Sequence, residues 1–316
     1  MSGFAYAVRG GAVTQPSIKA ALAEPGTLVW IHLTTNSDHA KQWLQGEAGL
    51  SPYIVEALTA AETRPRCDAV GEGAVINLRG LSADQLVASD PLASLRIYAR
   101  QGRVISVTRR HLNALDPVKA QVEIGKILDP GDLIAALAHE ITEELDPVVA
   151  DLGDTLDDCE EQLSGHGAFD LRRSVNETRS RAIGYRRFLG PQRAALEKLA
   201  LLPGAWLGED DRLHLNAAAD RAARMAEELE SIRERAALTH ETLTDLRSEQ
   251  IDQRSLIIAV AAMVFLPLTF VTGLFGMNVP LPFTHSDASF WWITVICIAM
   301  AAAITAYFIR RHWFPR

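Results

Sequence analysis

Four carboxylates share one face of a long segment near the C-terminal end of the sequence. If the segment is helical, steps of three and four residues connect these four, the funnel carboxylates: Glu234, Glu241, Asp245 and Asp252. Aligned carboxylates around an aqueous passage would raise the local concentration of cations. A row of charges is also the ordinary pattern of a solvated helix face, so the interpretation depends on what continues the row.

The same face continues into an uncharged segment as small or hydroxyl-bearing residues. These residues, the pore stripe, are Ser255, Ala259, Ala262, Leu266, Thr269 and Gly273. Small and hydroxyl residues on one face of an apolar helix permit either close helix packing or a wet lumen. We predict that the stripe lines a pore, with close packing as the alternative.

Two uncharged apolar runs predict helices that cross a membrane. Residues 256–275 and 290–309 each supply the ~20 residues that span about 30 Å of hydrocarbon. Basic residues lie only before the first run and after the second: Arg254, Arg310, Arg311 and Arg316. The segment 276–289 between them has no Lys or Arg, so the positive-inside rule places both termini in the cytoplasm and this loop outside an inner (plasma) membrane.

Charge and cysteine usage exclude several classes of protein. The formal net charge is −8, and the last 66 residues hold four basic and two acidic residues. That leaves 27 basic and 37 acidic residues, a net charge of −10, for residues 1–250. Such an acidic body does not favour nucleic acid as a partner. Cys67, Cys159 and Cys297 lie far apart, which argues against a disulfide framework or a cysteine zinc module.

The sequence gives no support for an enzyme. His139-Glu140 lacks the second histidine of a zinc hydrolase, and no GxxxxGK[ST] segment for ATP is present. We therefore expect no catalytic residues and no cofactor.

The elements predict an α+β protein in three parts. Residues 1–145 form a cytoplasmic mixed α/β funnel domain, residues 146–254 a helical region with a long stalk helix, and residues 255–316 a two-helix transmembrane domain. Short β-rich runs predict the strands 28–33, 74–80, 94–100 and 103–110. Helices are expected over 38–47 and 52–61, and then over 132–163, 170–202 and 210–275.

The stalk helix carries a heptad seam. Its members are Met225, Leu229, Ile232, Ala236, Thr239, Leu243, Leu246 and Gln250. A helix from Leu213 to Leu274 would extend on the order of 90 Å, which favours an oligomeric bundle in which copies pack on one another. The seam is also expected to pack on the two preceding helices of its own chain.

The end of the first apolar run resembles the signature of the CorA superfamily of divalent-cation transporters. Gly276-Met277-Asn278 closes the run, after Leu266-Pro267-Leu268-Thr269 and Gly273. Three further segments resemble the zinc-transporter branch, ZntB: Trp30-Ile31-His32-Leu33, Glu62-Thr63-Arg64-Pro65-Arg66 and Asn77-Leu78-Arg79-Gly80. The resemblance covers nearly the whole chain.

The resemblance implies a homopentamer in the lipid bilayer. Five first spans would line the pore and five second spans would surround them. It implies transport of a divalent cation, zinc uptake first, with coupling to protons left open. The alternatives are a magnesium, cobalt or nickel channel of the same fold and a membrane-anchored sensory protein that does not conduct.

The resemblance also makes Gly276, Met277 and Asn278 the selectivity motif at the outer mouth. The Asn278 amide oxygen can accept hydrogen bonds from water still bound to the ion, and Gly276 is expected to take backbone geometry that other residues resist. In the outer loop, His285 and Asp287 could assist capture. The stripe has neither His nor Cys, so metal contacts are expected to be transient, with no fixed site.

Overall fold

The computed structural model describes residues 2–34, 38–61, 64–82, 91–164, 168–277 and 288–312. The chain divides into two compact units, residues 1–240 and 241–316. One helix contributes residues to both units, and each unit is described on its own below.

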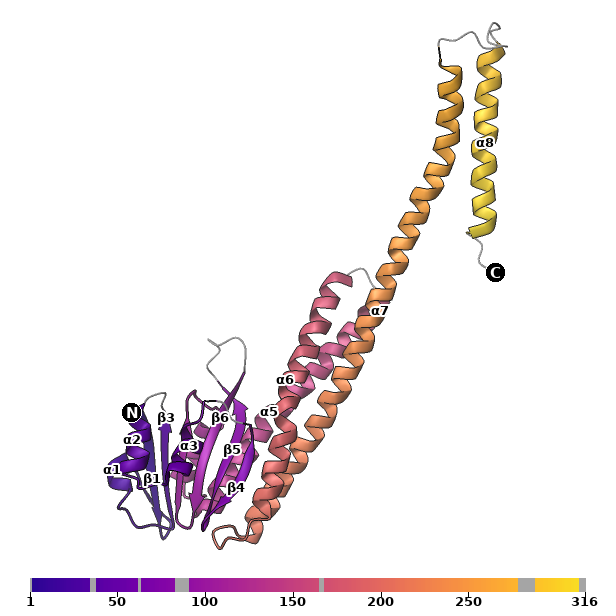
Figure 1. Cartoon of the computed structure of the whole chain (residues 1–316). Coiled ribbons are helices and arrows are strands. Elements are labelled where there is room, and N and C mark those ends of the chain that lie inside the picture. The colour runs from indigo at the N-terminus through magenta and orange to yellow at the C-terminus, as the bar shows by residue number, and fades with distance from the viewer. Residues whose placement is uncertain are drawn as a thin grey trace. The chain divides into compact units, whose positions relative to one another are not determined.

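A mixed seven-stranded sheet forms the base of the first unit (Figure 1). Its spatial order is β2-β1-β3-β7-β6-β5-β4. The strands are β1 (Ser2–Arg9), β2 (Ala12–Thr14), β3 (Leu28–Thr34), β4 (Arg66–Val70), β5 (Gly73–Leu81), β6 (Leu92–Arg100) and β7 (Arg103–Thr108). Among the described ladders only β3 with β7 is parallel. All four predicted strands are confirmed, and β1, β2 and β4 are additional.

The β6–β7 hairpin turns at Gly102, whose φ is +67°. Positive φ favours glycine at this position of a tight turn.

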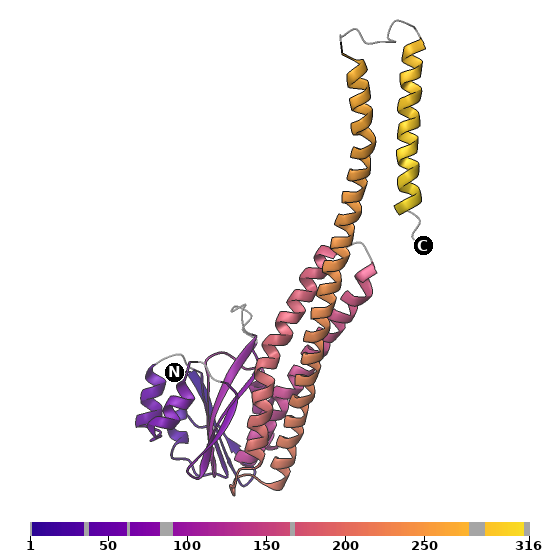
Figure 2. The same ribbon diagram turned by 45° about the vertical axis from the view of Figure 1, so that its right-hand side comes forward.

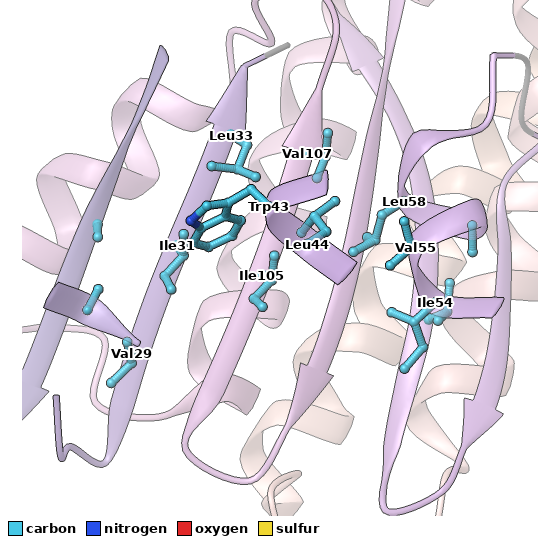
Figure 3. Packing of buried hydrophobic residues seen from close by; sticks show 14 of the residues in the cluster. Val29, Ile31, Leu33, Trp43, Leu44, Ile54, Val55, Leu58, Ile105 and Val107 are labelled. Carbon is cyan, nitrogen blue, oxygen red and sulfur yellow. The ribbon is translucent and has the colours of Figure 1, made fainter. Parts of the chain in front are cut away.

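Three short helices cover one face of the sheet. They are α1 (Ile18–Ala21), α2 (Asp38–Gly46) and α3 (Pro52–Thr59). Trp43 and Leu44 of α2 pack on the sheet residues Ile31 and Ile105 in a buried apolar cluster (Figure 3). Ser51 takes the N-cap position before Pro52, although its side chain makes no capping hydrogen bond.

The other face is covered by α4 (Leu115–Glu123) and by parts of two long helices, α5 (Pro130–Glu161) and α6 (Ala168–Ala200), with a short 3₁₀ turn, Gln162–Ser164, after α5. Gly80 of β5 permits the close approach of α5, because a Cβ there would lie 3.1 Å from Ile141. The long helix α7 (Glu209–Phe275) follows and continues through Pro267. The three long helices begin and end within two residues of the predicted bounds.

The heptad seam of α7 is buried inside the chain. Met225, Leu229, Ile232, Ala236, Thr239 and Leu243 are each at most 5% exposed. Only Leu246, half-buried, and Gln250, exposed, lie at its open end. The expectation that the seam joins copies is therefore wrong for these six residues, since their surface is already covered by the same chain.

The second unit pairs the C-terminal part of α7 with α8 (Ala288–His312). The two helices lie side by side in both views (Figures 1 and 2). Each has a window long and apolar enough to cross a membrane, with mean hydropathy of 2.4 and 2.2.

Candidate ion pathway

The six residues of the pore stripe are all exposed in the single chain. Leu266, the largest of them, is 69% exposed. A Cβ added at Gly273 would meet no atom within 4 Å, so that part of the surface is open.

The opposite face of the same span is the one that is partly covered. Its half-buried residues are Val260, Val264, Pro267, Leu268 and Val271. At 3.6 residues per turn, the centre of this face lies roughly 160° from the centre of the stripe. A matching half-buried row runs along α8: Ile293, Thr294, Cys297, Met300, Ala301, Ile304 and Phe308. The pairing with α8 thus leaves the stripe uncovered.

The four funnel carboxylates are also exposed. On the α7 helical wheel they lie roughly 180° from the buried seam and within about 60° of the stripe. Glu234 is 3.8 Å from the Arg233 guanidinium, a weak surface ion pair. Up to Leu243 these carboxylates lie on the side of the helix away from the buried seam, whereas around Asp252 every side of the helix is exposed.

The mouth motif is described only in part. The Gly276 amide donates to the Thr272 carbonyl at 2.9 Å, and Met277 is 55% exposed. Asn278, His285 and Asp287 lie outside the described residues. Gly276 is not among the glycines with positive φ, so the expectation of special backbone geometry is wrong. Its small size matters instead, because a Cβ would lie 3.0 Å from the Thr272 carbonyl oxygen.

One cluster of carboxylates could hold a metal ion. Ligand atoms of Asp129, Asp132 and Asp211 all lie within 4.8 Å of one another. Each carboxylate already accepts from backbone: Asp129 from Gly131 and Asp132, Asp132 from Leu128, and Asp211 from Gly208. These bonds cap the first turns of α5 and α7, which explains the cluster without an ion.

Burial is the main cause that raises the pKa of Asp211, and the nearby Asp129, Asp132 and Asp210 raise it further against the opposing hydrogen bond from Gly208. The N-cap position of Asp129 before Pro130 could have been recognised from the sequence. The arrival of Asp211 beside it depends on tertiary packing.

Ion pairs join the long helices. Arg186 of α6 contacts Glu230 of α7 at 2.8 Å, and Arg235 of α7 bonds Asp157 and Glu160 of α5. Asp157 and Glu160, which flank the buried Cys159 in the sequence, are therefore partners of Arg235. Their hydrogen bonds, that of Glu160 first, raise the pKa of the Arg235 guanidinium.

These features define a class of membrane protein, in which an α/β unit is followed by one long helix that ends in the first of two candidate spans. The chain belongs to the family described as CorA-like Mg2+ transporter protein, whose model matches residues 25–311.

Relatives with known names are similar over most of their length. The divalent cation transporter CmaX of Pseudomonas aeruginosa is 31% identical over 293 residues, which cover 92% of this chain and 88% of CmaX. The zinc transport protein ZntB of Pectobacterium atrosepticum is 27% identical over 286 residues, which cover 90% and 87%. The resemblance to the CorA superfamily is confirmed, and ZntB proteins are among the relatives.

Solved structures agree with the fold. The structure of a full-length CmaX protein superimposes with a TM-score of 0.83 at 30% identity and covers 98% of this chain and 97% of its own. The CorA magnesium transporter of Methanocaldococcus jannaschii has a TM-score of 0.81 at 16% identity and covers 99% of both chains. At that identity the second similarity concerns the fold alone.

Proposed function

We propose that this protein transports divalent cations across the inner membrane through a pore built from several copies of α7. The observation that carries the proposal is the exposed pore stripe, which lies opposite the face covered by α8. An apolar helix that served only as an anchor would need no such stripe. Membership of the CorA-like family supports the same assignment.

A single α7 cannot enclose a lumen, so the pore requires an oligomer. We propose a homopentamer, on the resemblance to the CorA superfamily. Since the seam is used within the chain, the contacts between copies come from the stripe side and from other exposed faces of α7. Five copies of the funnel carboxylates would then form acidic rings, although salt screens charges beyond about 8 Å.

The proposed ion is Zn²⁺, taken up in hydrated form. ZntB relatives are named for zinc, whereas CmaX is named for divalent cations in general. Zn²⁺ prefers nitrogen and sulfur ligands when bound directly, and the stripe has neither His nor Cys. Transient outer-sphere contacts, with Asn278 at the mouth, suit a hydrated ion. The same chemistry suits Mg²⁺, Co²⁺ or Ni²⁺, and Mg²⁺ gives up water especially reluctantly.

The proposed topology has both termini in the cytoplasm and residues 276–289 outside. A cysteine introduced into that loop should react with an impermeant thiol reagent added to intact cells, in a background with Cys67, Cys159 and Cys297 replaced. Labelling only after the membrane is opened would reverse the orientation.

The decisive experiment is uptake of Zn²⁺ and Mg²⁺, measured side by side, into liposomes that contain the purified protein. Ala262→Leu places a larger side chain in the proposed pore, narrows it, and should abolish flux of both ions. Ala261→Leu adds the same volume about 100° away on the same helix and should conduct. Equal flux by both variants would refute the stripe as the pore lining. An assembled wild-type protein without flux of any divalent cation would favour the sensory alternative.

Proton coupling is tested in the same liposomes. Imposing an inward proton gradient should accelerate Zn²⁺ uptake if import uses protons. An unchanged initial rate would indicate passive conduction.

A further inference from the structure

Arg96, in the middle of β6, is a buried cation that has no counter-ion among the described residues. The residue is 2% exposed. One of its terminal nitrogens donates to the Ala61 carbonyl at 3.3 Å, but its Nε–H has no hydrogen-bond partner. No ion pair involves Arg96 in the described part of the chain.

Asn77 lies directly across the antiparallel ladder from Arg96. It is 1% exposed, and neither its amide oxygen nor its amide nitrogen has a partner. Side chains of directly opposed residues project from the same face of a sheet and are close neighbours. Two adjacent buried side chains thus share three unpaired polar atoms, and buried polar groups in folded proteins are rarely left unpaired.

The charges that act on Arg96 are positive. Burial is the largest cause that lowers its pKa, to about 10, and Arg109 and Arg79 lower it further. The carboxylate of Asp68 on β4 is engaged elsewhere, by Lys198 at 3.1 Å and Arg66 at 3.5 Å. The field at this site therefore favours an added negative charge.

The end of helix α3 neutralises only part of this charge. The Ala61 carbonyl accepts from Arg96, and the Thr59 carbonyl accepts from Arg109 at 2.7 Å. The Thr59 carbonyl, at the last residue of α3, carries the partial negative charge of a helix C-terminus, whereas Ala61 lies two residues beyond the helix. Each of these carbonyls accounts for only one terminal nitrogen of its arginine. The Nε–H of Arg96 and the Asn77 amide remain unexplained, and a charge removed from water without a partner is strongly unfavourable.

We propose that Arg96 and Asn77 bind a small monovalent anion between β5 and β6, beside the C-terminal end of α3. Arg96 supplies the charge and an Nε–H donor, and Asn77 supplies an amide N–H donor. Because both residues are at most 2% exposed, the proposed ligand is a single small ion rather than a polyatomic one. A halide such as chloride fits this requirement, and a phosphate does not. The site is separate from the proposed ion pathway and concerns the soluble unit alone.

The test is the thermal midpoint of the full-length protein in detergent, titrated with sodium chloride or bromide against sodium gluconate at constant ionic strength. The wild type should show a saturable rise, roughly 5–10 °C at 100-fold above the dissociation constant. Arg96→Met should be independent of chloride and at least as stable as the wild type without it. Asn77→Ala keeps the positive charge of Arg96 but removes the amide donor. It should raise the half-saturating chloride concentration about 10-fold or more.

Arg103→Met is the matched control, because Arg103 also donates to a backbone carbonyl, that of Leu22, and is partly buried. It should keep the full chloride response. A bromide-soaked crystal should show an anomalous peak between Arg96 and Asn77.

A flat wild-type titration, or an unchanged saturable response in both Arg96→Met and Asn77→Ala, would overturn the proposal. The proposal would also fail if chloride stabilised the Glu62→Gln variant but not the wild type. In that case Glu62, which lies outside the described residues, would be the counter-ion of Arg96.

Discussion

Replacing Leu229 by Ala tests whether the α7 seam packs within one chain. Leu229 is fully buried, and truncation of such a leucine costs about 3 kcal/mol, within the usual 2–5 kcal/mol. For a unit of this size, that cost lowers the thermal midpoint by roughly 6–12 °C. Because the contact lies inside the chain, the shift should be the same at all protein concentrations.

The assay is thermal unfolding of the full-length protein, followed by circular dichroism at several protein concentrations, with particle mass from light scattering. Leu238→Ala is the matched control, because Leu238 lies on the opposite side of the same helix and is 64% exposed. Its effect on the free energy of unfolding should stay within about 0.5 kcal/mol. If Leu229→Ala left the midpoint unchanged and instead split the particle into smaller ones, the seam would join copies and our reading of it would be refuted.

Three further predictions concern the pathway and the helix caps. Neutralising the four funnel carboxylates with Gln and Asn should slow uptake at low ion concentration and matter less at saturation, as initial rates over a concentration series will show; equal slowing at all concentrations would contradict electrostatic attraction. Asn278→Ala should abolish selective uptake in liposomes while the assembly stays folded, and Asn278→Asp should tighten ion capture and slow release, because conduction requires binding weak enough to leave; an unchanged rate and ion preference in the Ala variant would make Asn278 a structural cap. Asp211→Asn keeps an oxygen acceptor for Gly208 and removes a carboxyl group whose pKa is raised in the folded protein. Ionising that carboxyl lowers the stability of the fold, and the loss grows as pH rises through the folded-state pKa. The variant should therefore gain more thermal stability at pH 8 than at pH 4, and an equal gain at both values would point to a cause other than ionisation.

Periodicity predicted most elements of the fold. The four strands found from the sequence alternate in burial or run through the centre of the sheet. The missed strands β2 and β4 are short and lie at the sheet edges, where mixed polarity conceals the pattern. β1 is rich in small residues and is likewise inconspicuous.

The same periodicity could not identify what covers each face. The seam from Met225 to Leu243 predicts burial correctly, but a sequence pattern does not distinguish packing within a chain from packing between chains. The pairing of Asn77 with Arg96 and the meeting of Asp129 with Asp211 depend on strand register and on helix packing. Neither was anticipated, because the partners are 19 and 82 positions apart. The stripe is exposed, as are most residues of the span, and the pore face stays a prediction.

The parallel pairing of β3 with β7 has a consequence for how the sheet folds. Residues 35–102 separate the two strands, whereas β6 and β7 are joined by a tight turn. Closing a loop of about 70 residues costs about 4 kcal/mol of chain entropy before the pairing is formed. The β4–β7 meander can form early, with β3 and its partner β1 added later. Until that step is complete, Val29–Thr34 and Arg103–Thr108 present unpaired backbone edges, which are open to pairing with other chains.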